Sequence, residues 1–242
     1  MDNKKITVVT PSVRSEMLPI IEKCLKRQTF KDFEWIVASP KDYGYGRFVQ
    51  EPPKNHGDYY GLNKAWNAAF KKAQGELIVS IQDGLWFPPD MLEKFWYHYL
   101  NNPRACVGAI GHQYDQIVNG KPENLVWSDP RARQDLGSFY EVDFPEIEWT
   151  VCSVPKKALY EIGGIDEEYD KYAALSEKDA NHRMSKLGYK HYLDQSIEYR
   201  AIHHPRLNNE WDKRYQEGCK AYIKHGEQII KGERLKLAFL DK

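Results

Sequence analysis

The feature that most constrains the fold is a regular alternation of strands and helices over the first 100 residues. Short apolar, β-branched runs at 5–11, 33–40 and 76–82 have the composition of strands. Between them, the segments 15–28 and 61–75 place apolar residues at helical spacing. Strands that alternate with helices in this way predict an α/β fold, in which right-handed crossovers build a mostly parallel central sheet flanked by helices.

Polar residues follow each of the three predicted strands. Ligands of parallel sheets bind outside the carboxyl ends of the strands, so the segments 10–14, 38–44 and 82–87 are expected to face a site. The third strand is apolar at nearly every position, as expected of a strand that is covered on both faces. Asp83 comes directly after it. Because Asp-Gly is a common turn pair, Asp83 is either a turn residue or a ligand.

The second half of the chain has a different organisation. Residues 105–115 and 147–155 resemble strands, and the polar, turn-rich segment 115–144 between them is expected to be a long loop. The apolar residues of 210–231 lie on one face of a predicted helix. We therefore expect a domain over residues 1–206 and a C-terminal helical extension over 207–242 that packs on the domain or on a partner.

Charge and cysteine usage exclude several classes of protein. Lys plus Arg and Asp plus Glu both number 35, so no global attraction to nucleic acid or to anionic membrane is expected. No apolar run is long enough for a signal sequence or a membrane span. The four cysteines are far apart and form no C-x-x-C pair, which argues against a zinc site. These features predict a cytoplasmic protein with reduced thiols.

Three polar clusters are the candidates for chemistry, since the chain has neither a Gly-rich phosphate loop nor a G-x-S-x-G elbow. They are Gln82-Asp83-Gly84, the pair Glu177 and Asp179, and His203-His204. Carboxylate and imidazole groups together suit Mn²⁺ or Mg²⁺, and a separate carboxylate suits a general base. The alternatives are a turn, acids that balance a helix dipole, and ordinary surface histidines.

The order of these clusters resembles that of a GT-A type glycosyltransferase, most closely of family 2. The resemblance covers roughly residues 4–206. It rests on the segments ITVVTPSVR, RQTFKDFEWIVAS, GLNKAWNAAFKKAQGELIVSIQDGLWFPPDMLEKF, LYEIGGIDEEY and SEKDANHRMSKLGYKHYLD.

The resemblance implies an enzyme that transfers a sugar from a nucleotide-sugar donor to a hydroxyl acceptor, with inversion. It assigns Glu177 as the base that takes the acceptor proton, with Asp179 as second choice. It assigns Asp83, with His203 or His204, as ligands of a divalent ion, Mn²⁺ or Mg²⁺. The donor-binding residues that it implies are Thr10, Pro11, Arg14, Ser39, Gln82 and Asp83.

Two positions depart from the family pattern. Ala38-Ser39-Pro40 stands where the family usually has acidic residues that help to hold uracil. Gln82-Asp83-Gly84 stands where it usually has two or three acids, which leaves Asp83 as the only carboxylate of the segment. Trp86, Trp127 and Trp149 are candidate acceptor contacts, and each of them also suits ordinary core packing.

Three other functions remain open at this stage. The first is the same chemistry on a modified DNA base, which the Lys and Arg residues of the C-terminal helix allow but do not favour. The second is an inactive binding module that keeps the fold. The third is a nucleotidyltransferase, which the missing Gly-rich loop argues against. The sugar, the acceptor and the oligomeric state are not specified by the sequence.

Overall fold

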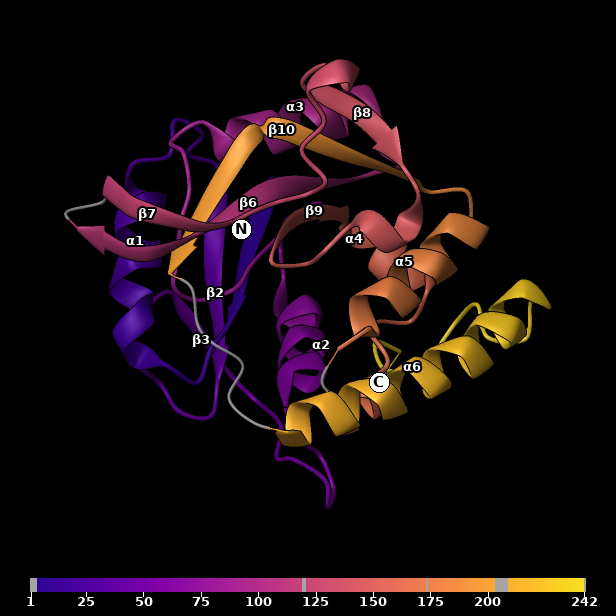
Figure 1. Ribbon diagram of the computed structural model, residues 1–242. Helices are drawn as coiled ribbons and strands as arrows, with labels where there is room; N and C mark the ends of the chain where they lie inside the picture. Colours follow the sequence, from indigo (N-terminus) through magenta and orange to yellow (C-terminus); the bar gives the residue numbers. More distant parts are fainter. Residues whose placement is uncertain (1–3, 119–120, 173, 203–208, 242) are drawn as a thin grey trace.

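A central sheet of ten strands organises the molecule, with helices on both of its faces (Figure 1). The computed structural model describes residues 4–118, 121–172, 174–202 and 209–241. Eight strands follow the order β3-β2-β1-β4-β9-β6-β10-β5, β7 pairs with β6, and β8 pairs with β10. The strands are β1 Ile6–Pro11, β2 Phe33–Ser39, β3 Arg47–Gln50, β4 Leu77–Ile81, β5 Leu85–Trp86, β6 Ala105–Val118, β7 Lys121–Ser128, β8 Phe139–Val142, β9 Val151–Pro155 and β10 Lys190–Ile202.

The predicted α/β class with a central sheet flanked by helices is confirmed. The first strands are parallel as expected, since β1 pairs in parallel with β2 and β4, and β2 pairs in parallel with β3. The other half of the sheet is mixed, because β9 runs antiparallel to both β4 and β6. The helices are α1 Leu18–Lys26, α2 Leu62–Lys72, α3 Met91–Asn101, α4 Lys156–Glu161, α5 Ser176–Lys186 and α6 Asn209–Ile230, with short 3₁₀ turns η1 Ser15–Met17, η2 Gln134–Leu136, η3 Phe144–Glu146 and η4 Glu167–Lys171.

Each face of the sheet has its own apolar core. On one face, the buried residues of α1 and α3 pack against strands β1 and β4, with Ile21 and Phe95 fully buried. On the other face, α2, α4 and α5 pack around two tryptophans, Trp66 and Trp149, whose rings meet edge to face at 5.7 Å. Because both faces of β4 are covered, its five residues are all buried, as its unbroken apolar run predicts.

The expected loop over 115–144 is wrong in its larger part. β6 continues to Val118 and forms an antiparallel hairpin with β7, and β8 pairs antiparallel with β10. The hairpin contains exposed apolar residues as well as polar ones, Leu125 at 57% and Trp127 at 40% among them. A ribbon with so little burial keeps its backbone hydrogen bonds without the alternating pattern that marks a half-buried strand. The polar composition of this segment therefore reflects exposure rather than irregular structure.

The C-terminal residues pack on the rest of the chain. α6 lies against α5, and the segment after it returns to the turn at Gly163, where the backbone N–H of Leu237 donates to the carbonyl of Ile162 at 2.8 Å. A Cβ at Gly163 would lie 1.5 Å from the carbonyl oxygen of Leu237, so only glycine allows this approach. The predicted boundary at residue 206 falls outside the described residues. None of the helices in the described part of the chain is long and apolar enough to cross a membrane.

Candidate active site

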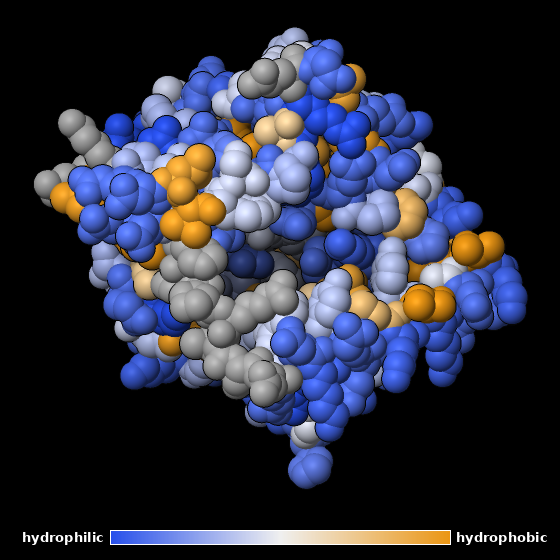
Figure 2. Space-filling model, viewed as in Figure 1, coloured by the Kyte–Doolittle hydropathy of each residue, from blue (hydrophilic) through white to orange (hydrophobic). Residues whose placement is uncertain are grey.

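Two adjoining cavities lie at the carboxyl ends of β1 and β4. The Asp83 cavity measures about 470 Å³ and the Glu177 cavity about 140 Å³. Both are lined by Tyr60, Leu62 and Gln82, so they meet at these three side chains. The side of the molecule shown in Figure 2 is hollowed near its centre, with mainly hydrophilic residues around the hollow. The cavities lie at the sheet edge at which a site is expected, and the predicted segment 38–44 lines neither of them.

Asp83 lies at the base of the first cavity with both carboxylate oxygens occupied. Its side chain is 8% exposed. Oδ2 accepts hydrogen bonds from the Ser12 hydroxyl at 2.7 Å and from Nε of Arg14 at 3.3 Å, and Oδ1 accepts from a terminal nitrogen of Arg14. The following residue, Gly84, has a φ of +79°, so Asp-Gly also makes a turn. Asp83 therefore makes a turn and an ion pair with Arg14, and its role as a ligand stays a prediction.

The predicted donor-binding residues do not all reach the cavity. Pro11, Arg14, Gln82 and Asp83 line it. Thr10 and Ser39 are fully buried, and their hydroxyls are used within the fold: Thr10 Oγ1 accepts from the indole N–H of Trp35 at 3.0 Å, and Ser39 Oγ donates to the carbonyl of Lys41 at 2.8 Å. Sequence reasoning missed Glu51 and Lys54, which also line this cavity, because the loop before α2 has no regular pattern.

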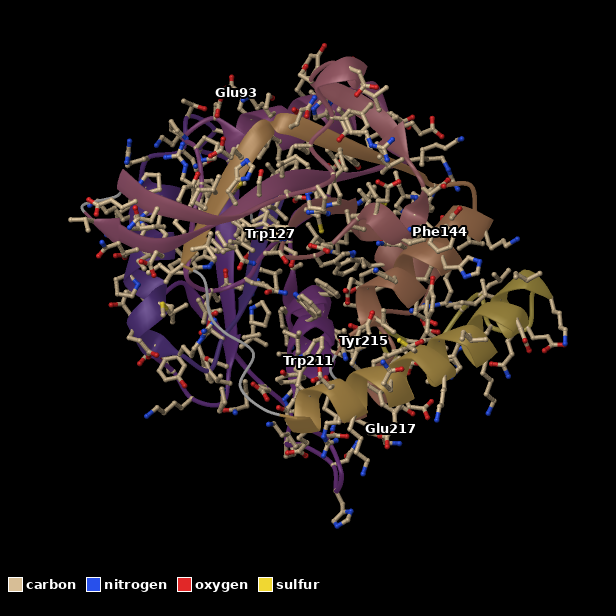
Figure 3. The ribbon with its side chains drawn as sticks, in the orientation of Figure 1. Glu93, Trp127, Phe144, Trp211, Tyr215 and Glu217 are labelled. Carbon is tan, nitrogen blue, oxygen red and sulfur yellow. The ribbon has the colours of Figure 1, made fainter. Side chains whose placement is uncertain are left out.

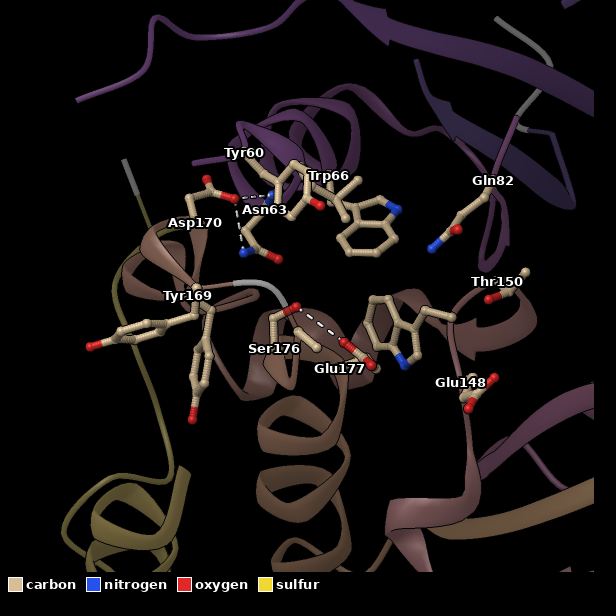
Figure 4. A pocket seen from close by; sticks show the side chains of 14 residues that line it. Tyr60, Asn63, Trp66, Gln82, Glu148, Thr150, Tyr169, Asp170, Ser176 and Glu177 are labelled. Carbon is tan, nitrogen blue, oxygen red and sulfur yellow. Dashed lines mark hydrogen bonds between the residues drawn. The ribbon is translucent and has the colours of Figure 1, made fainter. Parts of the chain in front are cut away.

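Glu177, the predicted base, is one of the acids that line the second cavity (Figure 4). It stands at the second position of α5, and its Oε2 accepts a hydrogen bond from the Ser176 hydroxyl at 3.2 Å. Burial raises the pKa of its carboxyl, and the charge of Glu148 raises it further. The residue before α5, Leu175, has a φ of +84°, an uncommon conformation for a bulky side chain. Strain of this kind is often found beside functional groups.

Asp179, the second choice of base, lies elsewhere. It is fully buried in an ion pair with Arg183, whose Nε donates to Oδ2 at 2.8 Å. The same guanidinium donates to the carbonyls of Ile162 and Gly164. Asp179 lines neither cavity. One helical turn separates it from Arg183, and this ion pair fastens α5 to the Gly-Gly turn. The geometry therefore distinguishes two acids that the sequence pattern presents together.

The remaining polar residues of the Glu177 cavity come from distant parts of the chain. Asp170, on η4, is fully buried and accepts hydrogen bonds from the N–H groups of Asn63 and Lys64 at the start of α2. Burial raises its pKa to about 7, although these hydrogen bonds act in the opposite direction. Glu148 and Thr150 come from the turn before β9. Sequence reasoning missed these residues because no local spacing links them to α2 or α5.

The three predicted tryptophans lie in different places. Trp149 is 2% exposed, lines the Glu177 cavity, and donates from its indole nitrogen to Oδ1 of Asn181 at 3.0 Å. Trp86, on β5, lines a separate cavity with Arg27 and Pro88. Trp127 is on the exposed β7 strand (Figure 3) and lines neither of the two adjoining cavities. The structure thus brings only Trp149 to the site.

Candidate metal ligands are few in the part of the chain that the structure describes. His203 and His204 lie outside the described residues. Asp166, Glu168 and His225 lie close enough together to bind one metal ion. These residues line neither of the two cavities, and Asp166 is already paired with Arg234. The Asp83 cavity is lined by two carboxylates, Asp83 and Glu51, and Asp83 is the one that follows β4. One carboxylate together with phosphate oxygens of a substrate is a usual donor set for Mg²⁺. Asp83 therefore fits a metal that binds with a diphosphate.

Comparison with solved structures defines the class of the fold as GT-A. The chain matches S. aureus TarS 1–349 in complex with UDP at a TM-score of 0.61 and 15% identity, over 95% of this chain and 70% of that one. It matches GalNAc-T7 with UDP, GalNAc and Mn²⁺ at a TM-score of 0.66 and 10% identity, over 93% of this chain and 50% of that one. Against a longer TarS structure it spans 42% of the chain. At these identities the matches show a shared fold.

The sequence model of glycosyl transferase family 2 matches residues 54–161, which include α2, β4 and the Asp83 turn. No curated protein sequence matches the chain. The chain thus has the GT-A fold, and its segment 54–161 is similar to glycosyl transferase family 2.

Proposed function

We propose that this protein is a glycosyltransferase that moves a sugar from a nucleotide-diphosphate donor to an acceptor hydroxyl, with inversion at the anomeric carbon. The observation that carries the proposal is the meeting of the two cavities at Gln82, with Asp83 and Arg14 on one side and Glu177 on the other. This arrangement gives the diphosphate and the acceptor separate places around one reacting carbon. The solved relatives with UDP support a uridine nucleotide as the first donor to test.

The diphosphate is assigned to the Asp83 cavity because, of the two cavities, this one is lined by cationic side chains. Arg14 and Lys54 both line it, and a guanidinium can bind a phosphate with two parallel hydrogen bonds. Asp83 is the described residue that would hold a divalent ion, and the predicted help of His203 or His204 stays a prediction. Such an ion, when bound with the donor, neutralises the charge that grows on the leaving diphosphate.

Glu177 acts as the general base in this proposal. Its carboxylate takes the proton of the acceptor hydroxyl while the hydroxyl oxygen forms a bond to the anomeric carbon. The bond from that carbon to the diphosphate oxygen breaks in the same step, and the electron pair leaves with the nucleoside diphosphate. A single displacement inverts the configuration. The raised pKa of Glu177 suits the role, because a base is more effective when its pKa is nearer the working pH.

The lining of the Glu177 cavity supports an uncharged, hydroxyl-bearing acceptor such as a saccharide. Among the described residues that line it, the charged ones are Glu148, Asp170 and Glu177, with no Lys or Arg. The aromatic ring of Tyr60, which is 38% exposed, offers a stacking surface for a sugar face. Acceptor phosphates beside the reacting hydroxyl would be repelled. On α6, Arg214 is paired with Glu210 and donates to the carbonyl of Lys171, which weakens the DNA alternative.

A donor panel tests the proposal. The protein is incubated with Mn²⁺ and a set of nucleotide sugars, and thermal shift, donor consumption and the anomeric configuration of the product are measured. We expect one donor to stabilise the protein. We expect Glu177→Gln to lower turnover by about 10²- to 10⁴-fold while donor binding stays within about twofold, since the base touches the acceptor rather than the donor. Absence of stabilisation by every nucleotide sugar, with and without metal, would favour the inactive binding module instead. Loss of donor binding in Glu177→Gln would remove its assignment as base.

A further inference from the structure

The only carboxylate in the Gln82-Asp83-Gly84 turn is already bound by a cation of the protein itself. Arg14 holds both oxygens of Asp83, and Ser12 donates a further hydrogen bond to Oδ2. An arginine guanidinium stays charged at any working pH, so Arg14 is a permanent counterion of Asp83 in this contact. A divalent ion that binds Asp83 must therefore compete with Arg14 for the same oxygens.

The two ends of this ion pair differ in burial. The Asp83 side chain is 8% exposed, whereas the Arg14 side chain is 43% exposed. Ser12 holds Asp83 in place from the end of β1, and the guanidinium lies at the cavity wall on the segment between β1 and η1. Of the two partners, Arg14 is therefore the one that can leave with little rearrangement.

A diphosphate in the same cavity offers Arg14 a second anion. Phosphate oxygens match the fork of guanidinium donors as well as a carboxylate does. Without a diphosphate, a metal that displaces Arg14 leaves a guanidinium facing a divalent cation in one cavity, which is unfavourable. With a diphosphate present, both cations have an anionic partner.

We propose that Arg14 is an exchangeable counterion of Asp83: it neutralises the carboxylate in the free enzyme and passes to the diphosphate when metal and nucleoside diphosphate bind together. This inference rests on the proposed function and adds a consequence to it. Metal and diphosphate bind cooperatively, and the coupling passes through one arginine. By linkage, each ligand raises the affinity of the other by the same factor.

Calorimetric titration tests the exchange without any turnover. Mn²⁺ is titrated into the protein alone, with saturating UDP, and with saturating inorganic pyrophosphate. Pyrophosphate lacks the nucleoside, so it reports on the diphosphate group alone. For the wild type we expect the diphosphate to raise Mn²⁺ affinity by about 5- to 150-fold, the usual range for coupled sites. Arg14→Gln is expected to bind Mn²⁺ alone more tightly than the wild type and to lose at least about tenfold of the coupling. Arg14→Lys keeps the charge without the fork and is expected to fall between the two.

A matched arginine provides the control. Arg47 pairs with Glu34 at 2.7 Å, and the two side chains are 42% and 12% exposed, close to the values for Arg14 and Asp83. Arg47 lines a different cavity, so Arg47→Gln should leave the coupling unchanged. Equal coupling in Arg14→Gln and the wild type, or wild-type Mn²⁺ binding that is as tight without diphosphate as with it, would overturn the exchange alone. Failure of the wild type to bind either diphosphate would overturn the proposed function along with it.

Discussion

Asp170 caps the first turn of α2 from 107 residues away: its Oδ1 accepts hydrogen bonds from both the backbone N–H and the side-chain amide of Asn63, each at 2.9 Å. Both residues line the Glu177 cavity, so this contact joins the wall that precedes α5 to the wall formed by α2 (Figure 4). The cavity is thus held together by a side chain that acts as a helix cap rather than as a catalyst.

Replacement of Asp170 by Ala should therefore lower stability. The change leaves the N–H groups of Asn63 and Lys64 buried without their acceptor, and we expect the free energy of unfolding to fall by about 2 kcal/mol. Urea unfolding measures the change. Asp115→Ala, at an exposed position of β6, is the control and should change stability by less than about 0.5 kcal/mol. Equal effects of the two substitutions would show that the cap contributes nothing specific.

Substitution of Asp179 should affect mainly stability, and substitution of Glu177 should affect mainly catalysis. Asp179→Asn breaks the buried ion pair with Arg183, and we expect it to cost about 3–5 kcal/mol of unfolding free energy while activity per folded molecule is largely kept. Glu177→Gln should do the reverse, with a loss of about 10²- to 10⁴-fold in kcat and little change in stability. Unfolding curves and single-turnover transfer rates measure the two effects. A stable but inactive Asp179→Asn variant would contradict this division of roles.

The pH profile of transfer should report on Glu177. Burial and the charge of Glu148 raise the pKa of its carboxyl above the ordinary value of about 4.3. The base works only when deprotonated, so kcat/KM should rise with pH through this raised pKa. Glu148→Gln removes one of the causes and should move the acidic limb to lower pH. A limb that stays in place in Glu148→Gln would show that another group controls it.

The raised pKa of Glu177 should affect stability in the opposite direction: activity rises with pH, whereas the stability that this carboxyl contributes falls with pH. A carboxyl whose folded pKa lies above its unfolded pKa contributes stability that is fully present below the unfolded pKa and is lost as pH rises through the folded pKa. Glu177→Gln has no such titration, so its unfolding free energy should fall less than that of the wild type over this pH window. Chemical denaturation at a series of pH values measures the difference.

The segment after α6 should contribute to the stability of the core that lies beside the Glu177 cavity. Leu240 is 6% exposed and belongs to the same core cluster as Trp66 and Trp149. We expect Leu240→Ala to lower the free energy of unfolding by about 2–4 kcal/mol. Ile230→Ala, at a 66% exposed position at the end of α6, serves as the control and should have a much smaller effect. Unfolding monitored by tryptophan fluorescence follows both variants.

Local pattern predicted those parts of the molecule in which one segment determines its own structure. The helix α2 and the strand β4 lie where their apolar spacing places them, and Asp83 follows β4 at the edge of the sheet. Glu177 was singled out by the family resemblance rather than by local pattern, and the structure places it among the lining residues of the second cavity.

Other parts depend on contacts between distant segments and could not be predicted. Nothing in the spacing of 177 and 179 shows that Arg183 takes one acid into the core and leaves the other at the cavity. Asp170 as a cap of α2 and Arg14 as the partner of Asp83 both arise from tertiary placement. Trp127 shows the converse, since an aromatic residue in a polar segment lies on an exposed hairpin rather than at the site. The sequence predicted that Trp211 and Tyr215 lie on one face of α6 (Figure 3), and the structure adds that their rings stack on each other.

The place of β9 in the sheet has a consequence for how the protein is made. β9 sits between β4 and β6, and β10 continues the sheet beyond β6, so residues 77–81 meet their second neighbour only after residues 151–155 exist. As the chain emerges from the ribosome, the first half carries strand edges that stay open until most of the protein has been synthesised. Open edges of this kind promote pairing with other chains. Late sheet completion therefore leaves the nascent chain with an edge of β4 that can pair with other chains until residues 151–155 have been made.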